Sequence, residues 1–205
     1  MDLALRLSRA IDALNERIGR GVLWLVLVAV LISAGNAVMR KTFNLSSNAF
    51  LEVQWYLFSA VFLLCAGYTL LRDEHVRIDL ISARCSPRAR AWIDIAGTLL
   101  FLLPMTLILL RLSWPVFVDA WASSEVSGNA GGLLRWPAKL LMPAGFALLA
   151  LQGISELVKR IAFLAGRAPD PLAARHGRRS ELDLADEIAR QRSGITHDCV
   201  SGRQH

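Results

Sequence analysis

The sequence predicts an all-α membrane protein with four transmembrane helices. Four stretches of the 205-residue chain are apolar over roughly the ~20 residues that a helix needs to cross a hydrocarbon core of ~30 Å. Basic residues alternate in number between the successive connections, and tryptophans lie near the ends of the stretches, as they do in membrane proteins. The predicted spans are about 22–39, 50–71, 91–112 and 137–158, within a membrane domain of residues 21–165.

Residues 1–20 predict an amphipathic helix that precedes the first span. Its apolar side chains share one helical stripe, while acidic and basic side chains occupy the remaining surface. The stripe consists of Leu3, Leu7, Ile11, Leu14 and Ile18. Gly19 and Gly21 permit a bend, so we expect this helix to lie in the membrane interface or against a partner. The alternative is a helical extension of the first span.

The distribution of basic residues predicts the orientation. The segments before, between and after the four spans contain four, two, five, one and nine Lys or Arg residues in chain order. Cytoplasmic segments carry the excess of Lys and Arg. We therefore expect a multi-pass protein of the bacterial inner membrane, with both termini and the middle connection in the cytoplasm.

The third connection and the C-terminal tail have distinct patterns. Trp114, Phe117, Val118 and Trp121 fall at helical spacing, which predicts a short helix on the periplasmic membrane surface. A glycine-rich turn over residues 128–132 follows, without the spacing of a phosphate-binding loop. Residues 166–205 are polar and charged, and we expect a flexible, largely disordered cytoplasmic tail.

Composition argues against several other classes of function. The net charge of +6 and a pI near 9.9 come from basic residues beside the apolar spans, where they meet anionic membrane lipids, so we expect no nucleic-acid partner. The four histidines lie outside the predicted spans, which excludes a haem held by two intramembrane histidines. Because neither metal-ligand spacing nor a nucleophile–base pair is present in the sequence, we predict no metal, no cofactor and no enzymatic activity.

Ionisable residues within apolar spans are costly, and here they lie near the span ends. By the predicted topology Glu52 and Arg111 share the outer level, and we hypothesise an ion pair between them. Asp94 enters the third span from the inner side, and Glu156 leaves the fourth span on that side. The alternative for these charges is a role in ion or proton translocation, although a side chain near a span end can also extend independently to the membrane surface. Small residues permit close helix packing, so we expect helix contacts at three glycines: Gly67, Gly97 and Gly145.

Five motifs in order resemble the small membrane subunit of tripartite ATP-independent periplasmic (TRAP) transporters. They are Glu52-x-Gln54-Trp55-Tyr56-Leu57-Phe58, Ala66-Gly67-Tyr68-Thr69-Leu70, His75-Val76-Arg77-Ile78-Asp79, Asn129-Ala130-Gly131-Gly132-Leu133-Leu134-Arg135-Trp136-Pro137-x-Lys139, and Pro143-x-Gly145-Phe146 with its continuation to Gly153. The resemblance covers residues 11–165. It is closest to the branch labelled for mannitol and chloroaromatic compounds, although Leu134 stands where proline is more usual.

This resemblance implies a scaffold subunit without a solute site of its own. A large multi-span permease would carry the substrate and sodium sites, and a periplasmic solute-binding protein would deliver an organic acid or a related small solute. The positions carried over from the family are candidates for subunit contact or structure, and Arg111 joins them through its hypothesised ion pair. These candidates are Glu52, Gln54, Trp55, His75, Arg77, Asp79, Arg111, Arg135, Trp136 and Pro137.

Two other classes of function stay open from the residues alone. An autonomous four-helix channel or exporter would need polar residues lining the middle of the spans, and these spans offer few. A membrane sensor or assembly factor would act through the charged tail.

Overall fold

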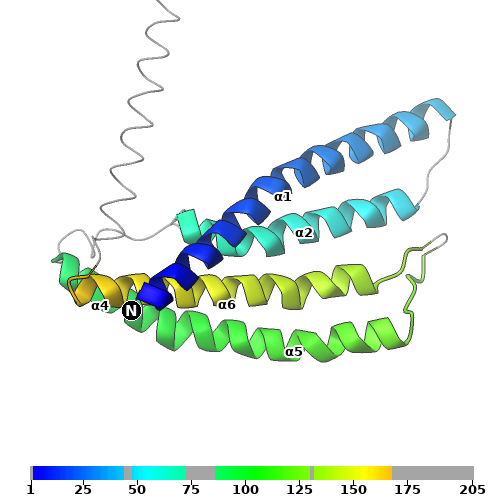
Figure 1. Cartoon of the computed structure of the whole chain (residues 1–205). Coiled ribbons are helices and arrows are strands. Elements are labelled where there is room, and N and C mark those ends of the chain that lie inside the picture. The colour runs from blue at the N-terminus through cyan, green and yellow to red at the C-terminus, as the bar shows by residue number, and fades with distance from the viewer. Residues whose placement is uncertain (1, 44–47, 73–85, 130–131, 168–205) are drawn as a thin grey trace, which may run out of the picture. The chain divides into compact units, whose positions relative to one another are not determined.

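The computed structural model of the chain describes residues 2–43, 48–72, 86–129 and 132–167. Every regular element within these ranges is a helix, and one isolated β-bridge joins Val126 to Leu134 (Figure 1). The elements are α1 (Asp2–Phe43), α2 (Asn48–Arg72), α4 (Pro87–Gly97), the π-helix η1 (Thr98–Leu102), α5 (Leu103–Ala122) and α6 (Trp136–Leu164).

Four helical segments of the described chain are long and apolar enough to cross a membrane, which confirms the predicted number and order of spans. All four are longer than the predicted spans, and two differ most: α1 has 42 residues, and α4, η1 and α5 form one segment of 36 residues. Within the unit that ends at Ile161, α1 packs along α2, and α6 runs beside α5 (Figure 1).

The predicted bend after residue 19 is absent from helix α1. The segment 2–20 is helical, as expected, but it continues into the first span without a break. Gly19 is buried because the ring of Tyr68 on α2 packs against it, so this glycine permits a close approach between helices. Within the predicted apolar stripe, Leu3 and Leu7 are 80% and 61% exposed and Ile11 is buried, while the polar Ser8 is also buried. An interfacial position of this segment stays a prediction.

The prediction of a separate surface helix after the third span is wrong. Helix α5 continues through Trp114 and Pro115 to Ala122. Pro115 removes one backbone donor, but the helix continues on both sides of it. Edge-to-face and tilted ring contacts follow along its C-terminal end, with Trp114–Phe117 and Phe117–Trp121 centroids 5.9 and 6.2 Å apart.

The π-helix η1 has a local cause. Pro104 lacks the N–H that would bond to the carbonyl four residues earlier, and the chain widens just before it. Leu103 instead donates its backbone N–H to the Thr98 carbonyl, five residues back. The Thr106 hydroxyl donates to the Leu102 and Leu103 carbonyls at 2.8 and 3.0 Å. These bonds keep the helix continuous across the proline.

The packing suits a lipid environment. Buried positions hold small or polar residues, such as Ala60, Ala120 and Thr106. Large apolar side chains point outward, including Trp55 and Phe62, which are 72% and 80% exposed. Helices in lipid associate through close packing and polar contacts, because lipid tails are as apolar as the side chains. This pattern fits a bundle whose outer surface meets acyl chains or other membrane helices.

Two of the three glycines expected at helix contacts lie there. At Gly145 on α6, an added Cβ would be 2.8 Å from both the Cβ and the carbonyl oxygen of Leu63 on α2. At Gly67 on α2, it would meet the Asn15 side chain and lie 3.3 Å from the Leu148 carbonyl. Gly97 is different, since nothing lies within 4 Å of its Cβ position. Gly67 and Gly145 thus set the separation of α2 from α1 and α6.

The second unit begins at Ala162, and the structure describes it only to residue 167. Gly166 has a positive φ of 69° just past the end of α6, where glycine adopts the left-handed conformation without strain. Its N–H donates to the Phe163 carbonyl at 2.9 Å, and Arg167 N–H donates to the Ala162 carbonyl at 3.0 Å. The predicted disorder of the tail lies outside the described residues.

Candidate functional site: polar clusters at both ends of the bundle

Glu52 organises the loop between α5 and α6. It lies in the second turn of α2 and is buried, with both carboxylate oxygens occupied. The Ser127 hydroxyl and the Asn129 amide donate to Oε1, the latter at 2.8 Å, and the Leu133 backbone N–H donates to Oε2 at 2.8 Å. Hydrogen bonds to an ionised acceptor are the stronger kind. Glu52 therefore fixes the loop to α2.

The hypothesised Glu52–Arg111 pair is wrong. The donors to Glu52 come from residues 127–133, and within the described chain Arg111 makes no ion pair. Arg111 lies in the middle of α5, on the opposite side from the buried residues Thr106 and Ser113, and it is exposed. Shared depth along two helices was the basis of the hypothesis, but depth alone does not place two side chains on facing sides.

A second acidic residue, Glu125, closes the loop at its base. Its carboxylate pairs with the Lys139 ammonium on α6 and with the Arg135 guanidinium at 3.2 Å. Arg135 also donates its backbone N–H to the Glu125 carbonyl at 2.8 Å, beside the Val126–Leu134 bridge. Hydrogen bonds from Lys139 and then Arg135 hold the pKa of Glu125 below its usual value.

Two further contacts give the loop one defined shape. The Tyr56 hydroxyl on α2 donates to the Leu134 carbonyl at 3.2 Å. A Cβ at Gly132 would be 2.6 Å from the Ser127 carbonyl oxygen, so only glycine fits there. The loop is thus bonded to α2 through Glu52 and Tyr56, and to α6 through Lys139.

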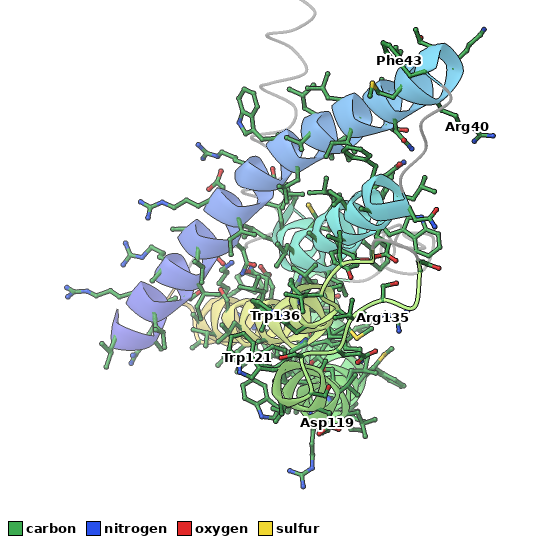
Figure 2. The ribbon with its side chains drawn as sticks, turned by 90° about the vertical axis from the view of Figure 1, so that its right-hand side faces the viewer. Arg40, Phe43, Asp119, Trp121, Arg135 and Trp136 are labelled. Carbon is green, nitrogen blue, oxygen red and sulfur yellow. The ribbon has the colours of Figure 1, made fainter. Side chains whose placement is uncertain are left out.

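The aromatic candidates have different surroundings. Trp136, at the start of α6, meets Trp121 of α5 edge-to-face with centroids 4.5 Å apart (Figure 2). Pro137 follows it in the first turn, where proline needs no intrahelical donor. Trp55 projects outward, whereas Gln54 donates to the Ser33 hydroxyl of α1 at 3.4 Å. Trp136 and Gln54 therefore contact neighbouring helices, and Trp55 is free to meet lipid or a partner.

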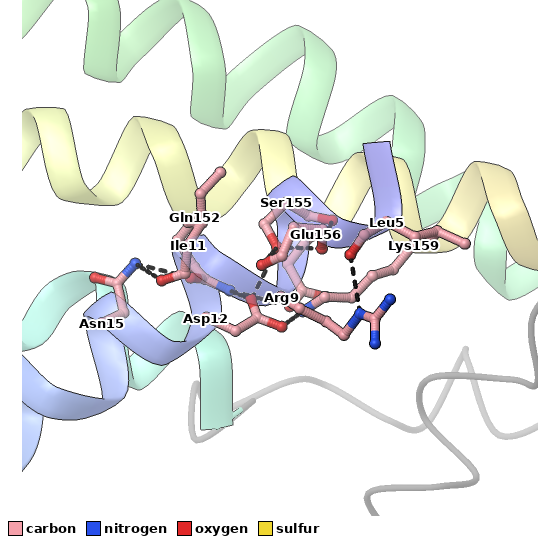
Figure 3. A network of polar contacts seen from close by, with 10 residues as sticks. Leu5, Arg9, Ile11, Asp12, Asn15, Gln152, Ser155, Glu156 and Lys159 are labelled. Carbon is pink, nitrogen blue, oxygen red and sulfur yellow. Dashed lines mark hydrogen bonds and ion pairs between the residues drawn. The ribbon is translucent and has the colours of Figure 1, made fainter. Parts of the chain in front are cut away.

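A buried polar seam joins the N-terminal part of α1 to the C-terminal part of α6 (Figure 3). The Asn15 amide donates to the Gln152 side-chain oxygen at 2.8 Å, and the Gln152 amide donates to Asp12 at 3.0 Å. The Ser155 hydroxyl donates to Asp12 at 2.8 Å and lies 2.7 Å from the Ser8 hydroxyl. These hydrogen bonds join the two helices, although the Asn15 side-chain oxygen itself accepts none.

Ion pairs extend this seam to the helix ends. Lys159 of α6 lies 2.6 Å from Asp12 of α1 and 3.0 Å from Glu156. Arg72 at the end of α2 lies 2.9 Å from Glu16 of α1. The buried side chain of Arg160 on α6 pairs with Asp94 of α4. Charges from α1, α2, α4 and α6 are therefore tied together at one end of the bundle.

The sequence analysis missed the seam between α1 and α6. Gln152, Ser155, Glu156 and Lys159 recur at helical spacing on α6, which marks a polar face inside an apolar helix. That signal was available, but the partners on α1 are about 140 residues away in sequence. Three other candidates, His75, Arg77 and Asp79, lie outside the described residues, so their predicted roles stay predictions.

The chemistry of these clusters is structural. Among the described residues, no group of three His, Cys, Asp or Glu side chains is arranged to hold a metal ion. The polar side chains at depth bond to one another across helices, and the outer ones shape the loop. The fold and its clusters thus define a small protein with four helices long enough to span a membrane, held together by polar contacts at both ends.

Comparison with known families identifies the class of protein. The family model of tripartite ATP-independent periplasmic transporters, DctQ component, matches residues 29–163, about two thirds of the chain. The chain belongs to this family and is a multi-pass protein of the bacterial inner membrane. No curated protein and no solved structure matches it. The match names no branch, so the predicted mannitol and chloroaromatic branch gains no support from it.

Proposed function

We propose that this small permease subunit is the scaffold of a TRAP transporter, and that it holds a large transport subunit in the membrane. The family match over residues 29–163 carries the proposal, because it makes the chain one component of a tripartite system. The large subunit would move the solute, and a periplasmic binding protein would deliver it. An organic acid or a related small solute, taken up with sodium, is the proposed cargo.

The polar clusters support a scaffold. Seam residues such as Asn15, Asp12 and Gln152 are engaged in contacts between helices of the same chain. Transporter solute sites instead present half-helix ends and unwound backbone to a cavity near the membrane centre. In the described chain, the π-helix η1 departs from α-helical geometry, but the Leu103 N–H still bonds to the Thr98 carbonyl across it. The chain is therefore suited to support a transport site in its partner.

The loop over residues 123–135 has a proposed role in the same complex. With both termini in the cytoplasm, the loop and Glu52 face the periplasm, where the binding protein would arrive. Its contacts to α2 and α6 give the loop a fixed shape in advance of binding. A preformed surface loses less conformational entropy when a partner docks.

Purification of the complex tests the proposal. The tagged chain is co-expressed with the large permease subunit of its system, and the amount of large subunit that is retained in mild detergent is measured. We expect a stable complex of the two chains. A large subunit that is produced in the membrane but never retained would contradict the scaffold function.

A further inference from the structure

We propose that the outward side of α5 around Arg111 binds a transmembrane helix of the large permease subunit, and that this helix presents a carboxylate to the Arg111 guanidinium. The inference rests on the proposed function for the identity of the partner. The main evidence for the inference is the position of Arg111 in this structure.

Arg111 points away from its own bundle. The buried residues of α5 are Thr106, Ser113 and Ala120, which recur every seven residues along one narrow stripe. At ~100° per residue, Arg111 lies about 140–180° around the helix from each of them. It is exposed, and it has no ion-pair partner among the described residues. Any group that neutralises this charge must therefore come from outside the described bundle.

The depth of Arg111 makes a lone charge costly. Trp121, which meets Trp136 edge-to-face, lies at the C-terminal end of α5, and Arg111 precedes it by ten residues, or about 15 Å at ~1.5 Å per residue. An extended arginine covers about half of that distance, so it does not reach the level of the tryptophan pair alone. Insertion of arginine into a membrane helix costs roughly 2.5–3.5 kcal/mol near the centre. A carboxylate at the same depth would remove much of this cost.

Pro115 leaves a backbone carbonyl at the same level without its usual helical donor. It has no N–H, so it cannot donate the usual helical bond to the Arg111 carbonyl four residues earlier. Pro115 lies about 40° around the helix from Arg111, on the same outward side. Hydrocarbon offers no donor to a free carbonyl. A neighbouring protein helix can supply both an acceptor for the guanidinium and a donor for the carbonyl, whereas acyl chains supply neither.

Two other charges within the described apolar helices have partners in the chain itself. Glu52 bonds to the outer loop, and Asp94 pairs with Arg160. Around Arg111 the exposed side chains are apolar, with Leu107 and Ile108 53% and 58% exposed. An apolar surface with one central arginine is complementary to an apolar helix with one acidic residue. Such a charged pair also fixes the register of the two helices.

The test compares three variants in the co-purification with the large subunit. Arg111→Leu should lower the retained large subunit at least fivefold, and Arg111→Lys, which keeps the charge, should lower it less than twofold. Arg40→Leu removes an exposed arginine at the end of α1 and should leave retention unchanged. Equal retention for Arg111→Leu and wild type would overturn the inference, whereas failure of wild type itself would contradict the proposed function.

Cross-linking covers the case in which Arg111→Leu does not fold. A photoreactive residue is placed at Ile108 of the chain that keeps Arg111, and the adducts are identified by mass spectrometry. We expect a cross-link to a membrane helix of the large subunit with Asp or Glu within one turn of the linked residue. Adducts with lipid alone, or with a helix that has no acidic residue within one turn, would overturn the proposed pairing.

Discussion

Replacing Gly145 with alanine would place a methyl group against the backbone of α2. The new Cβ would lie 2.8 Å from the Leu63 Cβ and carbonyl oxygen, about 0.7 Å short of the ~3.5 Å of favourable contact. Backbone atoms cannot rotate aside, so α2 and α6 must separate. Overpacking lowers the free energy of unfolding by about 1–3 kcal/mol, whereas the higher helix propensity of alanine raises it by up to about 1 kcal/mol.

Gly97→Ala is the matched control. This glycine is also helical, but nothing lies within 4 Å of its Cβ position. Alanine should stabilise the protein there by roughly 0.5–1 kcal/mol through propensity alone. We therefore expect Gly145→Ala to be about 1–3 kcal/mol less stable than Gly97→Ala. The assay is reversible unfolding in mixed micelles followed by tryptophan fluorescence. Equal stability of the two variants would refute the close packing of α2 on α6.

Three further predictions concern the polar clusters and the orientation. Gln152→Leu should destabilise the same micellar protein by about 1 kcal/mol, since Asn15 and Asp12 each keep another partner, and a loss above about 3 kcal/mol would contradict that account. Because the pKa of Glu125 is lowered, its ion pairs should persist down to the usual glutamate pKa of about 4.3 and be lost as the pH falls further, through the pKa of the folded state. Hydrogen exchange in residues 125–135 should increase over that lower pH range. The Glu125→Gln variant should show no such pH dependence. Reporter enzymes active only in the periplasm should be active when fused at positions predicted to be periplasmic and silent at positions predicted to be cytoplasmic. Activity in the middle connection would reverse the orientation. The active fusions are at Asn48 and Ser127, and the silent ones at Ser82 and Gly166.

Hydropathy located the four spans because the length and apolarity of a helix in lipid are properties of one segment. The errors arose where a distant segment decides the local structure. Gly19 predicted a bend, but the Tyr68 ring on α2 explains the glycine within a continuous helix. The surface helix was an error of a different kind, because residues 114–121 have a spacing that also occurs in the last turns of a longer helix.

In the candidate site, too, the sequence predicted local features but not the contacts between distant segments. The sequence indicated that Glu52 needs a partner, since a carboxylate in an apolar span is costly. It did not reveal that the partners are donors of the outer loop, because that requires the rotation of α2 and the path of residues 127–133. The α1–α6 seam has a visible polar face on α6, but pairing it with Asp12 and Asn15 requires the packing of the two helices.

Transport by reconstituted membranes tests the scaffold function most directly. Liposomes contain this chain, the large permease subunit, or both, and uptake is measured with a sodium gradient and the loaded periplasmic binding protein outside. The account predicts uptake only when both membrane chains are present. Solute flux through liposomes that contain this chain alone would contradict it and would favour an autonomous channel.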